Sequence, residues 1–262
     1  MEININKIIE NNEIANSRLY KMYEHILDNL KNNDSFSVDT DTIKKEHPTI
    51  YFPESKDLNI IFKNRDKSLL DSLSLPDETQ GAFVLSDEEG LLTGKKGYPD
   101  SFNVVVFIDD KEMEDFVEHE TYLDIEAGIP TENSRDYHLT SFCNTLTHEI
   151  EHAIEFMENS GGLTPNEVNE MNSLGDFNYD IFSCMTGYGM EKYGSSYDEI
   201  DQRMLKDDLS VMQVENDIID IVEERVETNS RRKLENSGVD LLSIYEEQLK
   251  IKRQPKTLSP TP

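Results

Sequence analysis

The segment from residue 139 to residue 157 constrains the fold of this chain more than any other. Apolar residues recur in it every three or four positions, namely Leu139, Phe142, Cys143, Leu146, Ile150, Ala153, Ile154 and Met157. This spacing gathers them into one stripe of an α-helix, which has to be buried against other elements. Gly161 and Gly162 follow as a stop signal. We therefore predict a long helix with one side in the core and polar residues on the other.

Short apolar runs before this helix predict a small sheet. They are DLNIIFKN from residue 57, AFVLS from residue 82 and NVVVFID from residue 103. Runs of this length that are rich in Val, Ile and Phe are typical of strands. AFVLS and GLLTG flank residues 87–90, which predicts a hairpin there.

Helical periodicity dominates the rest of the chain. Residues 13–32 have the pattern of an amphipathic helix. After Asp110 the pattern is helical almost to the end, apart from expected loops near residues 128–136, 159–164 and 191–197. The expected fold class is therefore α+β, with a small mixed sheet followed by a mostly helical C-terminal half.

The charge of the chain restricts its partners. It has 54 acidic and 25 basic residues, a net charge of -29. Nucleic acids and anionic lipids are bound through Lys and Arg, so we expect no direct nucleic-acid binding. The sequence contains no apolar run long enough to cross a bilayer, so we expect no membrane insertion. An acidic surface favours a protein partner with a basic surface.

Cysteines and the N-terminal sequence bear on the cellular compartment. Cys143 and Cys184 have no metal-binding spacing, which favours buried, reduced thiols over a disulfide framework. The N-terminal residues lack the basic start and continuous apolar run of a secretory signal peptide. We expect a cytoplasmic protein, or one secreted by a specialised system into a host cell.

Within the helix of residues 139–157, His148, Glu149 and His152 form an HExxH motif. Histidines four residues apart lie on the same face of a helix and can bind one metal ion. Glu149 lies beside them, where it can take a proton from a metal-bound water. The alternative is a pair of surface histidines on an acidic helix, which would leave Glu151 and Glu155 without a special role.

The HExxH motif in an apolar-striped helix that follows a strand resembles the zincin metallopeptidases. The resemblance is specific over residues 147–157 and rests on element order over residues 58–190. It implies one Zn²⁺ per chain, a site in a cleft beneath an edge strand, and hydrolysis of peptide bonds in a protein substrate. HExxH enzymes without a signal and propeptide also resemble the injected metalloprotease effectors of bacterial pathogens, which implies an effector or toxin acting inside cells.

The third zinc ligand is open at this stage. Position 155 is Glu and position 158 is Glu, which departs from the HExxHxxGxxH pattern of metzincins. In gluzincins the third ligand is a Glu on a later helix, and an acid four residues on orients the first histidine. Glu223, with Glu227 four residues later, is similar to this pattern and is our first choice, and Glu170, Glu158 or an Asp are alternatives.

Three tyrosines cluster in the segment GYGMEKYGSSYDE, namely Tyr188, Tyr193 and Tyr197. Some zincins use such a tyrosine to ligate zinc or to stabilise the oxyanion, and Tyr193 is the candidate here. Packing at helix ends is the simpler role of such tyrosines.

We expect four parts along the chain. Residues 1–35 form an N-terminal helix, 36–197 the catalytic core, 198–250 a helical part that completes the site, and 251–262 a flexible tail. The expected function is that of a zinc metalloendopeptidase. Alternatives are a catalytically idle acidic zincin scaffold that binds a basic partner, and a housekeeping or phage peptidase.

Overall fold

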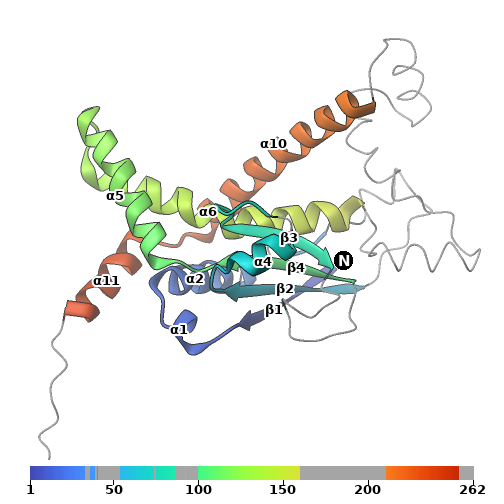
Figure 1. The fold of residues 1–262 in the computed structure, drawn as a ribbon, viewed down its shortest axis with the longest axis horizontal. Coiled ribbons are helices and arrows are strands. Elements are labelled where there is room, and N and C mark those ends of the chain that lie inside the picture. The colour runs from blue at the N-terminus through green and yellow to red at the C-terminus, as the bar shows by residue number, and fades with distance from the viewer. Residues whose placement is uncertain are drawn as a thin grey trace, which may run out of the picture.

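The computed structural model describes residues 1–32, 36–38, 40, 54–73, 75–86, 92, 100–159 and 211–253. The described chain has an α+β architecture with helices packed on a small mixed sheet (Figure 1). The strands are β1 (Glu2–Ile9), β2 (Ser55–Lys63), β3 (Gly81–Ser86) and β4 (Asp100–Phe107). The helices are α1 (Asn12–Ala15), α2 (Arg18–Asn32), α4 (Lys67–Ser72), α5 (Asp110–Glu126), α6 (Thr131–Asn159), α10 (Val211–Ser237) and α11 (Leu241–Arg253).

The four strands lie in the order β1-β2-β4-β3. β1 pairs with β2 and β2 with β4 in parallel, with Ile5 opposite Leu58 and Ile60 opposite Val104. β3 pairs antiparallel with β4 and lies at the edge of the sheet within the described part of the chain. The α+β class and the mixed sheet that the sequence predicts are therefore present.

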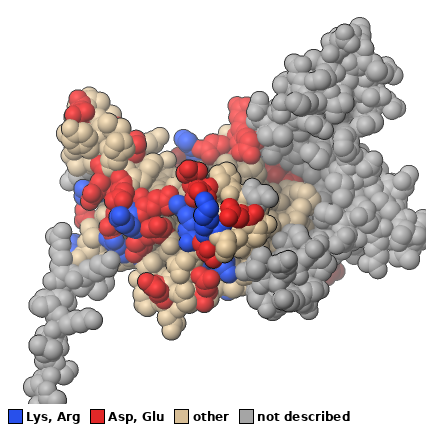
Figure 2. Space-filling model, viewed as in Figure 1, with Lys and Arg blue, Asp and Glu red and all other residues tan. Residues whose placement is uncertain are grey.

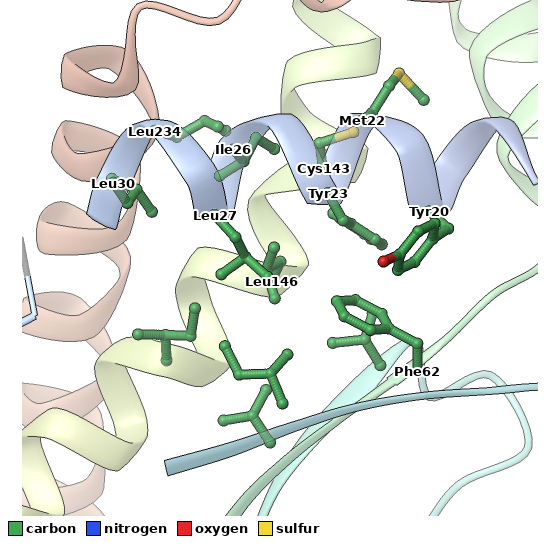
Figure 3. Packing of buried hydrophobic residues seen from close by; sticks show 14 of the residues in the cluster. Tyr20, Met22, Tyr23, Ile26, Leu27, Leu30, Phe62, Cys143, Leu146 and Leu234 are labelled. Atoms are coloured by element: carbon green, nitrogen blue, oxygen red, sulfur yellow. The ribbon is translucent and has the colours of Figure 1, made fainter. Parts of the chain in front are cut away.

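One face of the sheet forms the main core with α2 and α6. Leu58, Ile60 and Phe62 of β2 and Phe102, Val104 and Val106 of β4 point into it. Figure 3 shows the α2 residues Tyr23, Ile26 and Leu27 packed over Leu146 of α6 and Phe62. Tyr20 meets the edge of the Phe62 ring with centroids 5.0 Å apart, and Tyr23 stacks on it at 6.2 Å.

The opposite face carries a smaller apolar cluster. Ile61, Val105 and Phe107 pack there with Leu69 and Leu70 of α4. Because β2 and β4 are covered on both faces, their sequences are nearly continuous apolar runs rather than alternating ones.

Strand β1 was not predicted from the sequence, which placed an N-terminal helix in residues 1–35. Its sequence EININKII is interrupted by Asn, a residue that strands seldom contain. The structure explains these residues, because Asn4 donates a hydrogen bond to Asp57 at 3.1 Å and Asn6 one to Asn59 at 3.4 Å across the β1–β2 pair.

The expected single helix over residues 13–32 is two helices, α1 and α2, with a break at residues 16–17. The break is stabilised by caps. Asp110 accepts hydrogen bonds from the backbone N–H groups of Arg18 and Leu19, and the Ser17 hydroxyl accepts one from Tyr20 N–H.

The loop expected over residues 128–136 is shorter than predicted. α5 ends at Glu126 and is followed by Gly128 in the left-handed region (φ 85°), and α6 begins at Thr131. His138, which falls beyond the expected loop, is in the interior of α6, where it is buried and its Nε2 lies 2.7 Å from Asp124 of α5. Ser134 of α6 also donates a hydrogen bond to Asp124, so contacts with α5 accompany the earlier start of α6.

Some expectations fall outside the described residues. They are the GLLTG half of the hairpin, of which only Leu92 is described, and the tail beyond residue 253. The described partner of β3 is β4. The four-part division of the chain stays a prediction. Among the described helices, none combines the length and apolar character that crossing a bilayer requires.

Phe62 provides a test of this packing. The side chain is fully buried and contacts both Tyr20 and Tyr23, so Phe62→Ala should lower the free energy of unfolding by about 3–5 kcal/mol. Leu123→Ala, at an exposed position on α5, should change it by less than about 0.5 kcal/mol. Urea denaturation followed by circular dichroism measures both, and equal losses would contradict the assigned core.

Candidate metal centre

His148 and His152 lie one turn apart on α6, on the side that faces α10. Both side chains are half-buried, and their Nε2 atoms are 3.1 Å apart. The opposite side of this turn carries Leu146, Ile150 and Ala153 into the main core. The helix position is therefore fixed by packing, and the two imidazoles converge on one point.

Glu223 of α10 reaches the same point from the facing helix. Its carboxylate oxygens lie 3.5 Å from His152 Nε2 and 3.7 Å from His148 Nε2. Ligands at about 2.0–2.1 Å from a tetrahedral zinc ion are separated by about 3.3 Å. The three side chains thus form a group whose donor atoms fit around a single ion.

The packing of α10 on α6 brings Glu223 to the histidines. Asn144 contacts Ser230 near one end of the contact and His152 contacts Glu223 near the other, so the two helices run antiparallel. Two acidic residues of α6 face α10 and are almost completely buried, Glu151 with 3% and Glu155 with 4% of its surface exposed. Glu151 pairs with Lys233, and Glu155 lies 3.8 Å from Arg225.

Glu227 contacts Nδ1 of His148, the ring nitrogen that is not next to His152 and Glu223. Its carboxylate lies 3.2 Å from His148 Nδ1, and it also accepts hydrogen bonds from Arg231 and from Asn144. Partial burial works to raise the pKa of Glu227, but the hydrogen bond and charge of Arg231 together with the contact to His148 outweigh it, and the pKa lies below its usual value. An ionised Glu227 favours the tautomer with a proton on Nδ1, which leaves Nε2 free to bind a metal ion.

His152 is suited to the same role. Burial lowers its pKa, although Glu223 acts in the opposite direction. The neutral imidazole is the form that binds metal ions.

Glu149 lies between α6 and the edge strand β3. Burial raises the pKa of its carboxyl to about 7, while His148 and a hydrogen bond from the backbone of Phe83 partly offset that rise. Gly81, the first residue of β3, makes the close approach possible. A Cβ there would lie 2.9 Å from Cγ of Glu149 and 2.9 Å from Cγ2 of Thr145.

A cavity of about 500 Å³ adjoins His148 and Glu149. Its walls come from the N-terminal half of α6, from α10 and from residues 78–81 at the start of β3. Thr145 of α6 donates a hydrogen bond to the Gln80 side chain at 3.0 Å, which ties the start of the edge strand to the helix. Of the candidate metal group, His148 lines this cavity, and the cavity is large enough to admit the side chain of a ligand.

The structure thus brings together His148, Glu149, His152 and Glu223 among the residues that the sequence singled out. Glu158, near the end of α6, is not part of the group. Glu170, Tyr188, Tyr193 and Tyr197 lie outside the described residues. The alternative of two surface histidines on a solvated acidic helix does not fit, because Glu151 and Glu155 are buried and paired with α10.

Sequence analysis did not find Gly81 or Gln80 as parts of the site. A signal for Gly81 exists, because a Gly directly before the apolar run AFVLS marks a possible close approach of the backbone. For Gln80 the sequence offers no such signal.

Comparison of the sequence with protein-family models and with curated proteins, and comparison of the structure with solved structures, found no match.

Zinc binding should stabilise the folded chain, because Glu223 is brought to the histidines only when α10 packs on α6. At a free zinc concentration 100 times the dissociation constant, the gain is about 2.7 kcal/mol. The expected rise in Tm is about 5–10 °C, reversed by a chelator. It should disappear in His148→Ala and Glu223→Ala but persist in His25→Ala, an exposed histidine of α2. Equal shifts in all four proteins would indicate non-specific binding.

Proposed function

We propose that this chain is a zinc-dependent metallopeptidase of the zincin type, similar to the gluzincins. One observation carries the proposal: two imidazoles and a carboxylate converge at distances suited to one zinc ion, and Glu149 lies next to them. His148, His152 and Glu223 are the proposed ligands, one ion per chain. A set of three protein ligands is typical of catalytic zinc sites, which keep a position for water or substrate.

The bound ion would supply Lewis-acid chemistry, polarising a substrate carbonyl and lowering the pKa of water. Glu149 provides the base. One of its carboxylate oxygens accepts the proton of the attacking water as the bond from water oxygen to carbonyl carbon forms. It then gives that proton to the amide nitrogen as the carbon–nitrogen bond breaks, so that the amine leaves neutral.

Several residues of the chain hold Glu149 in this role. The backbone of Phe83 hydrogen-bonds its carboxylate, and Gly81 leaves room for its Cγ. Glu227 orients His148 through Nδ1, and Arg231 in turn binds Glu227. These contacts reduce the freedom of the base and of the first imidazole before a substrate arrives.

The position of β3 favours an extended peptide as substrate. β3 is the edge strand of the described sheet, and the hydrogen bond from Phe83 to Glu149 shows that its free edge faces the site. An extended chain can pair with such an edge through its backbone, and this mode of binding is general to peptide recognition.

The biological setting stays a prediction. We propose a protein substrate with a basic surface, on the ground of the net charge of -29. Figure 2 shows acidic side chains spread over the described part of one face, with a smaller group of basic ones between them. An effector that acts inside host cells, or a cytoplasmic enzyme, would both suit this proposal.

The Glu149→Gln variant tests the reaction separately from the metal. It keeps the size of the side chain but removes the base, so hydrolysis should fall by about 10²–10⁴-fold while zinc content stays near one per chain. The substrate is a pool of denatured cellular proteins, and mass spectrometry of new N-termini measures cleavage. Glu118→Gln, an exposed acid on α5, is the control and should cut as the wild type does.

Zinc bound by both proteins with no cleavage by the wild type would favour the alternative of a catalytically idle acidic scaffold. Cleavage that is equal in the wild type and Glu149→Gln would contradict the proposed role of Glu149.

A further inference from the structure

The cavity of about 500 Å³ beside the candidate metal centre has a strongly acidic lining. Four carboxylates contribute to it, those of Glu78, Glu149, Glu227 and Glu235. Among the described residues that line the cavity, Arg231 is the only Arg or Lys. The lining therefore carries an excess of negative charge even after Arg231 is counted.

Arg231 does not offset the two outer acids. Its guanidinium hydrogen-bonds Glu227 and also the hydroxyl of Tyr137, and both contacts raise its pKa. Glu227 itself is engaged with His148. Arg231 and Glu227 therefore pair with each other, and Glu227 also contacts His148.

Glu78 and Glu235 are in a different position. Glu78 precedes β3 and Glu235 is in the last turns of α10, so the two acids come from different walls of the cavity. Both are exposed, and neither has an ion-pair partner among the residues that the structure describes. Two unpaired carboxylates at one cavity attract a cation more strongly than either does alone.

The same cavity offers apolar surface for the stem of a long side chain. Leu234 of α10 is nearly buried at its wall, and the ring of Tyr137 of α6 lies exposed at it. Lys and Arg side chains place their methylene groups on apolar surface and extend the charged end to polar groups. An aromatic ring nearby adds a favourable contact for a cation.

We propose that this cavity binds a Lys or Arg side chain of the peptide substrate, next to the bond that is cut, and that Glu78 and Glu235 determine this preference. This inference rests on the proposed peptidase function. The binding of peptides can nevertheless be measured without their hydrolysis, so the preference can be tested separately from cleavage. A carboxylate ligand is disfavoured, because the guanidinium that could bind it is already occupied by Glu227.

The experiment measures binding to zinc-loaded Glu149→Gln protein, so that bound peptides are not cut. The probe is a library of decapeptides in which one position at a time is fixed as Lys, Arg, Leu or Glu, and captured peptides are quantified by mass spectrometry. One position should enrich Lys and Arg over Glu by roughly tenfold. The double substitution Glu78→Lys with Glu235→Lys, made in the same background, should abolish or reverse that enrichment.

A matched control separates the cavity from the overall charge of the chain. Glu246→Lys with Glu247→Lys, two exposed acids of α11 that do not line the cavity, makes the same change in net charge. This control should keep the positional preference, and the Tm of both double variants shows whether they fold. Enrichment of basic residues at every position, lost equally in both double variants, would overturn the proposal, as would the absence of any positional preference.

Hydrolysis by the protein with Glu149 intact distinguishes the two proposals. Cleavage without preference for a basic residue would leave the peptidase function standing and refute the specificity. A positional preference for Lys or Arg with no cleavage would leave the cavity assignment standing and refute the peptidase.

Discussion

The antiparallel packing of α10 on α6 is the contact on which the site depends. α6 alone provides two histidines and Glu149, but the third candidate donor, Glu223, and the carboxylate beside Nδ1 of His148, Glu227, both come from α10. The contact is specified by charge as well as by shape, since Glu151 and Glu155 are buried at it and have Lys233 and Arg225 as partners. A buried carboxylate that loses its partner is costly, so these pairs disfavour other registers of the two helices. The geometry of the metal group is therefore a consequence of helix packing.

The sheet sets the other wall of the site. Strands β2 and β4 are covered on both faces, while β3 lies at the edge of the described sheet, and its backbone at Phe83 hydrogen-bonds Glu149. Gly81 lets this strand approach α6 more closely than any residue with a Cβ would allow. Glu149 lies between α6 and the edge of β3, which fixes its position. The adjoining cavity leaves room for an extended chain to reach it. The proposed chemistry and the proposed substrate class follow from this arrangement.

Most elements with a continuous apolar pattern could be predicted from the sequence. Elements whose formation depends on contacts between distant segments could not. The runs around residues 60, 84 and 105 are strands and the stripe over residues 139–157 is helical, because burial dictates their composition. β1 was missed because its Asn residues are explained only by their partners on β2. His148, Glu149 and His152 could be chosen from a local motif. Glu223 was the first choice from its spacing with Glu227, but Glu170 and Glu158 stayed open, and the α6–α10 contact is what brings Glu223 to the histidines. The same holds for Glu78 and Glu235, which are 157 positions apart in the chain and meet only at the cavity.

The central claim is that His148, His152 and Glu223 hold one zinc ion, and anomalous diffraction from crystals grown with zinc tests it directly. Data collected on both sides of the zinc absorption edge should show one peak about 2 Å from Nε2 of both histidines and from a carboxylate oxygen of Glu223. A peak elsewhere, or a peak at the histidines with Glu223 turned away from it, would contradict the account.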